Sequence, residues 1–261
     1  MLESVINISE GRNESVLAQL AQCVGGALLD LHTDHHHNRS VFTLLVIEPA
    51  RVLTRTAIEM LSIDSHDGVH PRLGIVDVVP FVPLDTSTFS DALRARNDFA
   101  QWAAEELNLP VFLYGPERTL PEVRKNAFKT LLPSVGPQVP HKSAGAVCAG
   151  AREPLVAWNI WLRDVDLETT QQIAKQIRSE QIRTLGLQVG TFTQVSCNLI
   201  SPHTHGPDVA YDLVAAIAPI ERCELVGLIP TFALEKISQN RWETLDLEKS
   251  KTIEWRLKHL T

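Results

Sequence analysis

Apolar positions in the first part of the chain switch between strand-like runs and helical spacing, which indicates alternating strands and helices. Residues 16–24 show helical spacing that ends at Gly25-Gly26, and a second helical pattern covers Pro49–Leu61. The strand-like runs are Leu2–Ile8, Ala27–Leu31, Val41–Ile47 and Ile75–Val82, with the polar segment His32–Ser40 as a long hairpin connection. The order β-α-β-β-α-β predicts a ferredoxin-like unit, an antiparallel sheet with two helices on one face.

The middle of the chain adds a further helix, a short strand and a segment rich in proline. The helix is expected over Ser87–Leu107 and the strand over Val111–Tyr114. Gly115–Gly145 then contains five prolines, which predicts mostly irregular structure. Because long irregular segments in compact proteins are usually functional, we interpret it as a ligand loop at a domain edge.

After Gly150 the same order of elements returns, without any visible sequence repeat. The expected strands are Leu155–Trp161, Leu185–Gly190, Phe192–Leu199 and Cys223–Leu228, and the expected helices are Leu167–Arg178 and Pro207–Ala218. The chain is therefore predicted to be an α+β protein of two ferredoxin-like (βαββαβ) sandwich subdomains, residues 1–150 and 151–261. A ligand cleft is expected between them. The tail from Glu235 onward is interpreted as a C-terminal helix packed on the outside.

Composition excludes several classes of partner. The 261 residues are 44% hydrophobic and carry a formal net charge of −7, with no basic run. This argues against nucleic acid and anionic membranes, which are bound through clustered Lys and Arg. No apolar stretch approaches the roughly 18 residues of a spanning helix. Four widely spaced cysteines and an acidic N-terminus favour reduced thiols in a cytoplasmic protein.

The segment Asn7–Arg12 lies where a strand-like run turns into a helix. Backbone N–H groups at a helix start and the Arg12 guanidinium favour an anionic or carboxylate ligand. Simple helix capping by Ser9 or Asn13 is the structural alternative.

Three adjacent histidines, His35–His37, invite a metal hypothesis. Consecutive side chains on a strand point to opposite faces, and zinc sites normally use separated ligand pairs, so the pattern does not favour one. The following amide and guanidinium, Asn38 and Arg39, suit a polar substrate better.

The segment His66–Asp77 places His66, His70, Arg72 and two aspartates within one short connection. Histidine has an unperturbed pKa near 6.5 and exchanges protons at neutral pH, so His70 is a candidate acid–base group. Asp67 or Asp77 could orient its ring, and Arg72 could bind a carboxylate. The alternative is that His70 only ends a helix.

A fourth segment, Gly136–Ala146, is either a flat ligand loop or a linker.

In this order these segments resemble the glutamate formiminotransferase family, which includes the formiminotransferase half of formiminotransferase-cyclodeaminase and free-standing bacterial relatives. The resemblance spans about residues 4–235. The matching motifs are Asn7–Arg12, Asn38–Phe42, His66–Asp77, Gly136–Ala146, Gly150–Arg152, Gln194–Leu199 and Glu224–Pro230.

The resemblance implies a folate-dependent transfer of the formimino group from N-formimino-L-glutamate to tetrahydrofolate, in histidine degradation and one-carbon metabolism. Tetrahydrofolate would be a co-substrate, and no metal is expected. His70 would be the catalytic histidine. The implied folate or substrate residues are Asn7, Ser9, Arg12, Asn38, Arg39, His66, Arg72, Asp77, Gly136, Pro137, Gly145 and Ala146. The resemblance and the edge strands of two open sheets also predict a homodimer.

Two other functions are compatible with the same residues. One is a related folate enzyme that acts on 5-formyltetrahydrofolate, and the other is a folate-binding homologue without catalysis. The intact His70, Arg72 and Asp77 argue against a site that has lost its chemistry.

Overall fold

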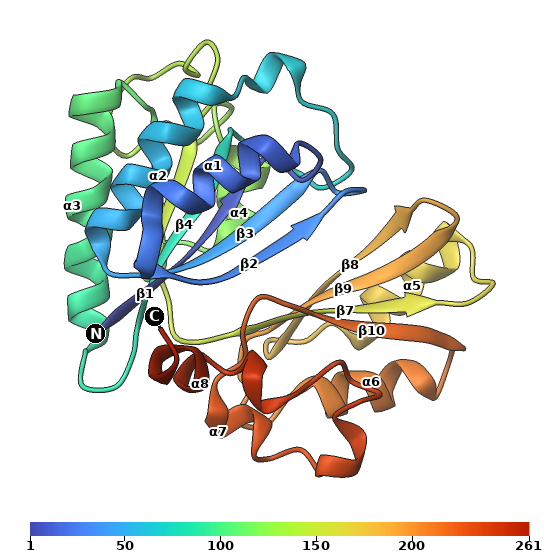
Figure 1. Ribbon diagram of the computed structural model, residues 1–261. Helices are drawn as coiled ribbons and strands as arrows, with labels where there is room; N and C mark the ends of the chain where they lie inside the picture. The colour runs from blue at the N-terminus through green and yellow to red at the C-terminus, as the bar shows by residue number, and fades with distance from the viewer. Residues whose placement is uncertain (261) are drawn as a thin grey trace. The chain divides into compact units, whose positions relative to one another are not determined.

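The computed structural model describes residues 1–260, and the chain forms two compact units, Met1–Glu153 and Pro154–Thr261. Each unit is a sheet covered by helices, so the protein belongs to the α+β class (Figure 1).

The first unit contains a six-stranded sheet in the order β2-β3-β1-β4-β6-β5. Its strands are β1 (Leu2–Ile8), β2 (Leu28–Asp34), β3 (Arg39–Leu45), β4 (Val76–Pro83), β5 (Val111–Tyr114) and β6 (Val147–Ala151). The first four pair antiparallel, in the strand order of a ferredoxin-like fold, as the alternation of periods predicts. Strands β6 and β5 extend this sheet in parallel beyond β4.

Helices of the first unit begin and end at residues that satisfy their terminal backbone groups. The helices are α1 (Glu14–Val24), α2 (Ile47–Met60), α3 (Phe89–Leu107) and α4 (Leu120–Asn126), with single 3-10 turns at Gly25–Ala27 and Ile63–Ser65. Asn13 caps α1, and Thr88 and Asp91 form a capping box at α3. Helices α1, α2 and α3 cover one face of the sheet, and α4 lies on the other (Figure 1).

The second unit has a four-stranded antiparallel sheet in the order β10-β7-β9-β8, again the ferredoxin-like order. The strands are β7 (Val156–Leu162), β8 (Ile182–Val189), β9 (Phe192–Leu199) and β10 (Ile220–Val226). Helices α5 (Leu167–Ile177) and α6 (Pro207–Ala215) pack on one face, over a core that includes the fully buried Trp158.

The prediction of one outer C-terminal helix is wrong. Helix α7 (Thr231–Leu234) ends just before the tail, and the tail forms short pieces: 3-10 turns at Gln239–Arg241 and Lys249–Lys251 and helix α8 (Ile253–Lys258). Between them Leu245 is fully buried, and its carbonyl accepts a hydrogen bond of 3.0 Å from the indole N–H of Trp158. The tail therefore completes the core of the second unit, because it satisfies the polar atom of the largest buried side chain.

One further expectation needs correction in the first unit. Strand β2 continues to Asp34 and β3 begins at Arg39, so the hairpin connection is residues 35–38 and not His32–Ser40. The segment expected to be mostly irregular, Gly115–Gly145, is so apart from the short helix α4. The sequence pattern did not predict strand β6. It is rich in small residues, and a Cβ on its Gly150 would lie 2.0 Å from the ring of Tyr114, so only glycine fits there.

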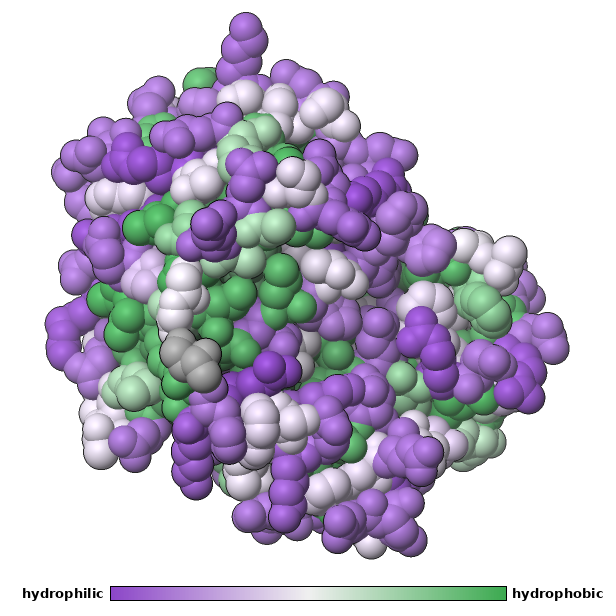
Figure 2. Space-filling view, in the orientation of Figure 1, coloured by the Kyte–Doolittle hydropathy of each residue, from purple (hydrophilic) through white to green (hydrophobic). Residues whose placement is uncertain are grey.

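Polar side chains dominate the face of the molecule in Figure 2, and apolar side chains gather in separate patches between them. A surface with both kinds of side chain is usual for folded domains. Within residues 1–260, no helix is both long enough and apolar enough to cross a bilayer.

Candidate active site

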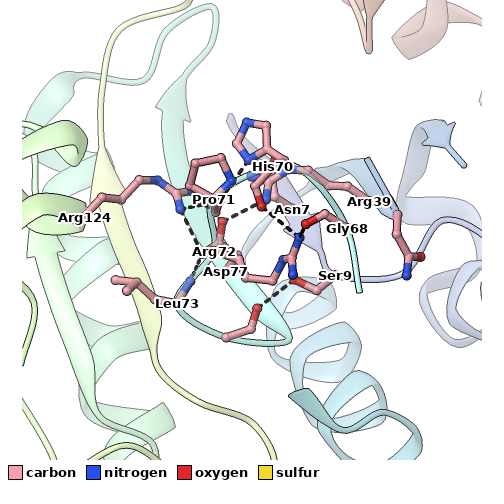
Figure 3. Close-up of polar contacts among 12 residues, drawn as sticks. Asn7, Ser9, Arg39, Gly68, His70, Pro71, Arg72, Leu73, Asp77 and Arg124 are labelled. Atoms are coloured by element: carbon pink, nitrogen blue, oxygen red, sulfur yellow. Dashed lines mark hydrogen bonds and ion pairs between the residues drawn. The ribbon is translucent and has the colours of Figure 1, made fainter. Parts of the chain in front are cut away.

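A buried carboxylate, Asp77 at the start of β4, organises the candidate site (Figure 3). The pairing of β1 with β4 shifts here, since Asn7 pairs with Val78 and Ile8 with Val76, which leaves Asp77 as the extra residue of a β-bulge. Bulges turn a side chain away from the regular alternation and are frequent beside active sites. The bulge therefore aims a carboxylate at the end of the sheet where the His66–Asp77 connection lies.

Two arginines from different elements bind this carboxylate. Arg39 of β3 donates from Nη1 to Asp77 Oδ2 over 2.9 Å, and its Nε donates to Asn7 Oδ1 over 3.0 Å. Arg124 of α4 donates from Nη2 to the same Oδ2 over 2.5 Å. The backbone N–H of Leu73 donates to Oδ1 over 2.7 Å. Asp77 thus ties together β1, β3, α4 and the connection that precedes β4.

The electrostatics of this cluster follow from burial and from its arginines. Burial alone would raise the pKa of Asp77, but Arg124 and Arg39 overcome this and lower it to about 2. The carboxylate is therefore ionised at neutral pH. Two guanidinium groups share one carboxylate, so the cluster keeps a net positive charge.

His70 is joined to this cluster through the carbonyl oxygen of Pro71. The Nδ1 of His70 lies 2.9 Å from that oxygen, and Arg124 Nη1 donates to the same oxygen over 2.6 Å. A carbonyl oxygen only accepts, so Nδ1 carries the proton, and in the neutral ring Nε2 is left with the lone pair. Figure 3 shows the imidazole extending away from the Asp77–Arg124 cluster.

Its surroundings keep His70 neutral. Burial is the main cause that lowers its pKa well below 6.5, and the positive charges of Arg39 and Arg124 act in the same direction. The group therefore titrates on the acid side of neutrality and not near it. A neutral imidazole with a free Nε2 is suited to accept a proton at physiological pH.

Ser9 and Asn38 hold the loops around His70 in place. Ser9 is buried, and its hydroxyl donates to the Gly74 carbonyl over 2.8 Å. The amide of Asn38 accepts from the Gly11 N–H over 2.9 Å and donates to the Asp67 carbonyl over 2.8 Å. Asn38 adopts a left-handed conformation with φ 46°, which asparagine tolerates better than most residues. Their polar atoms are thus used within the protein.

His66 and Arg72 brace the same connection. His66 Nε2 donates to the Asn38 carbonyl over 2.8 Å, and burial lowers its pKa. Arg72 Nη2 donates to the carbonyls of His70, over 2.9 Å, and of Gly68. Arg12 is exposed, and its Nε donates to the His35 carbonyl over 2.9 Å.

The segment Gly136–Ala146 divides into two parts. Its end lies against the His70 connection, because Ala146 N donates to the Leu73 carbonyl over 3.0 Å and Ile75 N donates to the Ala144 carbonyl over 2.9 Å. Gly145, at φ 73°, pairs with Gly74 there, and a Cβ on it would lie 2.3 Å from the Leu73 carbonyl oxygen. Gly136 and the following Pro137 are elsewhere, since Gly136 packs against the Leu109 carbonyl before β5.

The histidine run also divides. His35 and His36 are exposed on the turn and contact each other through their rings, whereas His37 is 6% exposed and packs against the ring of His70. Within residues 1–260, no group of three His, Cys, Asp or Glu side chains is arranged to hold a metal ion.

Comparison with known proteins shows the family of the chain. Residues 1–152 match the family described as the formiminotransferase domain, N-terminal subdomain. The chain is 30% identical to a glutamate formimidoyltransferase of Streptococcus pyogenes serotype M1, over 97% of each chain. It is 31% identical to a protein of the same name from Thermoplasma acidophilum, over 92% of this chain and 91% of that one. The chain belongs to the formiminotransferase family.

A longer relative shows the same similarity. The formimidoyltransferase-cyclodeaminase of Rattus norvegicus is 32% identical over 90% of this chain, which corresponds to 51% of that protein. This member of the formiminotransferase family is therefore similar to about half of the longer protein.

Sequence reasoning missed Arg124 of this formiminotransferase. It lies in the segment that was expected to be mostly irregular. Because no helix was predicted there, nothing in the sequence placed Arg124 near Asp77. A signal was present nevertheless. Thr119 and Glu122 form a capping box, and Pro121 stands in the first turn, which together mark a helix start.

We predict that Asp77→Asn lowers the free energy of unfolding by about 3–5 kcal/mol at pH 7, because it leaves two buried guanidinium groups without their carboxylate. Urea unfolding followed by circular dichroism measures this. The matched control is Asp212→Asn, which removes an ion pair with Arg241 in which the aspartate side chain is 63% exposed. That change should cost less than about 1 kcal/mol.

The pH dependence has a defined sign. A carboxyl that titrates near 2 when folded and near 3.8 when unfolded stabilises the protein above pH 3.8 and loses this effect as the pH falls toward 2. The difference in the free energy of unfolding between the native protein and Asp77→Asn should therefore become smaller as the pH falls from 3.8 toward 2. A constant difference would contradict the charge-based account of Asp77.

Proposed function

We propose that this protein is a glutamate formimidoyltransferase that moves the formimino group of N-formimino-L-glutamate to tetrahydrofolate. The observation that carries the proposal is His70, a neutral imidazole whose Nδ1 is committed to the Pro71 carbonyl and whose Nε2 has a lone pair. Membership of the formiminotransferase family and the names of its relatives support the choice of reaction.

The reaction requires one proton to move between two nitrogens. The folate nitrogen attacks the amidine carbon, and a tetrahedral intermediate forms. His70 Nε2 takes the proton from the folate nitrogen. It returns that proton to the glutamate nitrogen as the carbon–nitrogen bond breaks, so glutamate leaves as an amine and His70 ends unchanged.

The lowered pKa of His70 affects the two halves of this task differently. It keeps the ring neutral and able to accept a proton at pH 7, although as a weaker base, and once protonated beside Arg39 and Arg124 the ring gives the proton up more readily than an ordinary imidazolium. An amidinium carbon is already electrophilic, so the proposed chemistry needs no metal.

The positive charge around Asp77 supports a substrate with carboxylates. Arg39 and Arg124 share one buried carboxylate, and Arg12 and Arg72 lie on the adjoining loops. Formiminoglutamate and the glutamate tail of folate are both anionic, and guanidinium groups bind carboxylates well. Asn7 donates to the Val5 carbonyl and accepts from Arg39, so with Ser9, Asn38 and His66 it supports the site, whereas the exposed Arg12 is the strongest candidate for substrate contact.

Tetrahydrofolate is assigned as a co-substrate that leaves as product. The Gly145–Ala146 end of the 136–146 segment lies against the His70 connection and is our candidate for the folate side of the site. Gly136 and Pro137 are retained as more distant candidates. We place the reaction in histidine degradation and one-carbon metabolism in the cytoplasm, because four free cysteines suit a reducing compartment.

A direct assay distinguishes the candidate functions. Purified protein with formiminoglutamate and tetrahydrofolate should release glutamate in an amount equal to the 5-formiminotetrahydrofolate formed. Conversion of 5-formyltetrahydrofolate without that transfer would favour the related folate enzyme. Folate binding without turnover of either compound would favour a binding protein.

His70→Asn should lower turnover by roughly 10²–10⁴, the usual contribution of a general acid–base group. Asparagine retains hydrogen bonding near the Pro71 carbonyl, so folate affinity and the melting temperature should stay close to the native values. The native pH profile of kcat/KM should have its acid limb below pH 6.5, because only the neutral ring accepts a proton. His66→Asn should cost less, and His36→Asn almost nothing. Retention of more than about a tenth of turnover would show that His70 is not the proton carrier.

Folates should stabilise the protein. A ligand at 100 times its dissociation constant adds about 2.7 kcal/mol to the free energy of unfolding. For a chain of this size the melting temperature should rise on the order of 5 °C with saturating 5-formyltetrahydrofolate. Scanning calorimetry measures the shift. An unchanged melting temperature would contradict folate binding but not the predicted fold.

We also infer a homodimer, supported by the family resemblance and by β2 and β8, which stand at one edge of the first and of the second sheet. Light scattering at micromolar concentration should give twice the chain mass of 29.0 kDa. A mass equal to one chain would exclude the dimer.

A further inference from the structure

We propose that His37 is a positioning residue of the active site, whose buried ring packs on His70 and both orients it and shields it from water. The ring centroids are 5.9 Å apart and the ring planes meet at 78°, an edge-to-face arrangement. Ring pairs in this geometry attract each other beyond simple burial. The contact joins the β2–β3 turn to the loop that carries the proposed proton carrier.

The turn itself holds His37 firmly. Its backbone N–H donates to Asp34 Oδ1 over 2.8 Å, and its Nε2 lies 3.8 Å from Asp34 Oδ2. The next residue, Asn38, bonds to both Gly11 and Asp67. On the other side, a Cβ on Gly68 would lie 2.4 Å from the His37 carbonyl oxygen, so the His70 loop approaches the turn at backbone distance.

This placement matters because His70 is tethered by only one ring atom. The hydrogen bond from Nδ1 to Pro71 fixes a distance but allows the ring to swing about it. A second ring packed edge-to-face with it restricts that swing, so Nε2 keeps one orientation. Small errors in the position of a catalytic group are costly, since a displacement of about 1 Å can lower a rate by about 10².

The same contact covers part of the His70 ring, which is half-buried. Burial is the largest cause of its lowered pKa, ahead of Arg39 and Arg124, while Asp77 and the Pro71 carbonyl act in the opposite direction. Arg72, on the same loop, is the other charged side chain close to His70, bonded to its carbonyl. Of the groups that face His70, His37 is the aromatic ring in contact with it.

The inference rests on the proposed function for its kinetic part only. Two variants separate packing from proton transfer. His37→Phe keeps a ring without nitrogen atoms, and His37→Ala removes the ring. His36→Ala is the matched control, because His36 stands beside His37 on the same turn but is exposed and contacts His35.

The first readout is the pKa of His70, followed by its ring proton signals in an NMR titration that needs no substrate. In His37→Ala more of the ring is exposed to water, so the pKa of His70 should rise toward 6.5. In His37→Phe and His36→Ala it should stay at the native value. Because no turnover is involved, this result stands even if the assay finds no formimino transfer.

The second readout is the formimino transfer itself. His37→Ala should lower kcat about 10-fold to 100-fold with little change in KM, and His37→Phe should retain most of the native kcat. If His37→Ala does not fold, His37→Gln takes its place, since it fills similar volume without a ring and should show the same two shifts. An unchanged His70 pKa in the ring-less variant overturns the inference. A His37→Phe variant as impaired as His37→Ala overturns it too, because a proton-carrying role would then replace packing.

Discussion

The buried carboxylate of Asp77 is the constraint on which the site depends. It is fully buried, and it accepts hydrogen bonds from Arg39, Arg124 and the Leu73 backbone N–H. Strand β3, helix α4 and the connection that carries His70 are therefore all held at this one carboxylate. A buried ion of this kind is tolerated only when it is paired and hydrogen-bonded. The pairing explains the positive character of the site, because two arginines share this one negative charge. It also adds to the effect of burial, the main reason why the pKa of His70 is low, since the same arginines disfavour an imidazolium.

Much of the framework could be predicted from the sequence because it rests on periodicity. Strands β1 and β5 have the predicted bounds, and the order of elements in both units indicated the α+β, ferredoxin-like class. Each error has its own local reason. After Val147, strand β6 consists of small residues without a β-branched side chain, and α4 is too short for a clear helical period. The tail around Leu245 was predicted to be an outer helix because its sequence is amphipathic. The same pattern is found in a segment that buries its apolar residues in a core, as this tail does.

The site was only partly predictable for a related reason. Sequence spacing brings His66, His70, Arg72 and Asp77 together because they share one connection. It cannot show that Arg124 returns to Asp77 from a distant segment, or that His37 and not His36 turns inward. Nor does it show the bulge at Asp77, which depends on pairing with β1. Ser9 and Asn38 were predicted to contact a ligand, but their side chains form hydrogen bonds within the protein. Only the fold shows that they hold loops in place and do not bind substrate.

The parallel extension of the first sheet has a consequence for the order of assembly. Strand β5 pairs with β6 along its length and with Val135 by one bridge at Val111, and β6 pairs with β4, although Val147–Ala151 follows Val76–Pro83 by more than sixty residues. Closing such a long loop is slow compared with forming a hairpin. Until β6 is in place, β5 and α4 have no sheet partner to dock on, and Arg124 is not held beside Asp77. The ferredoxin-like core can therefore exist before the site does, and a chain interrupted ahead of Val147 would be folded in part but chemically unfinished.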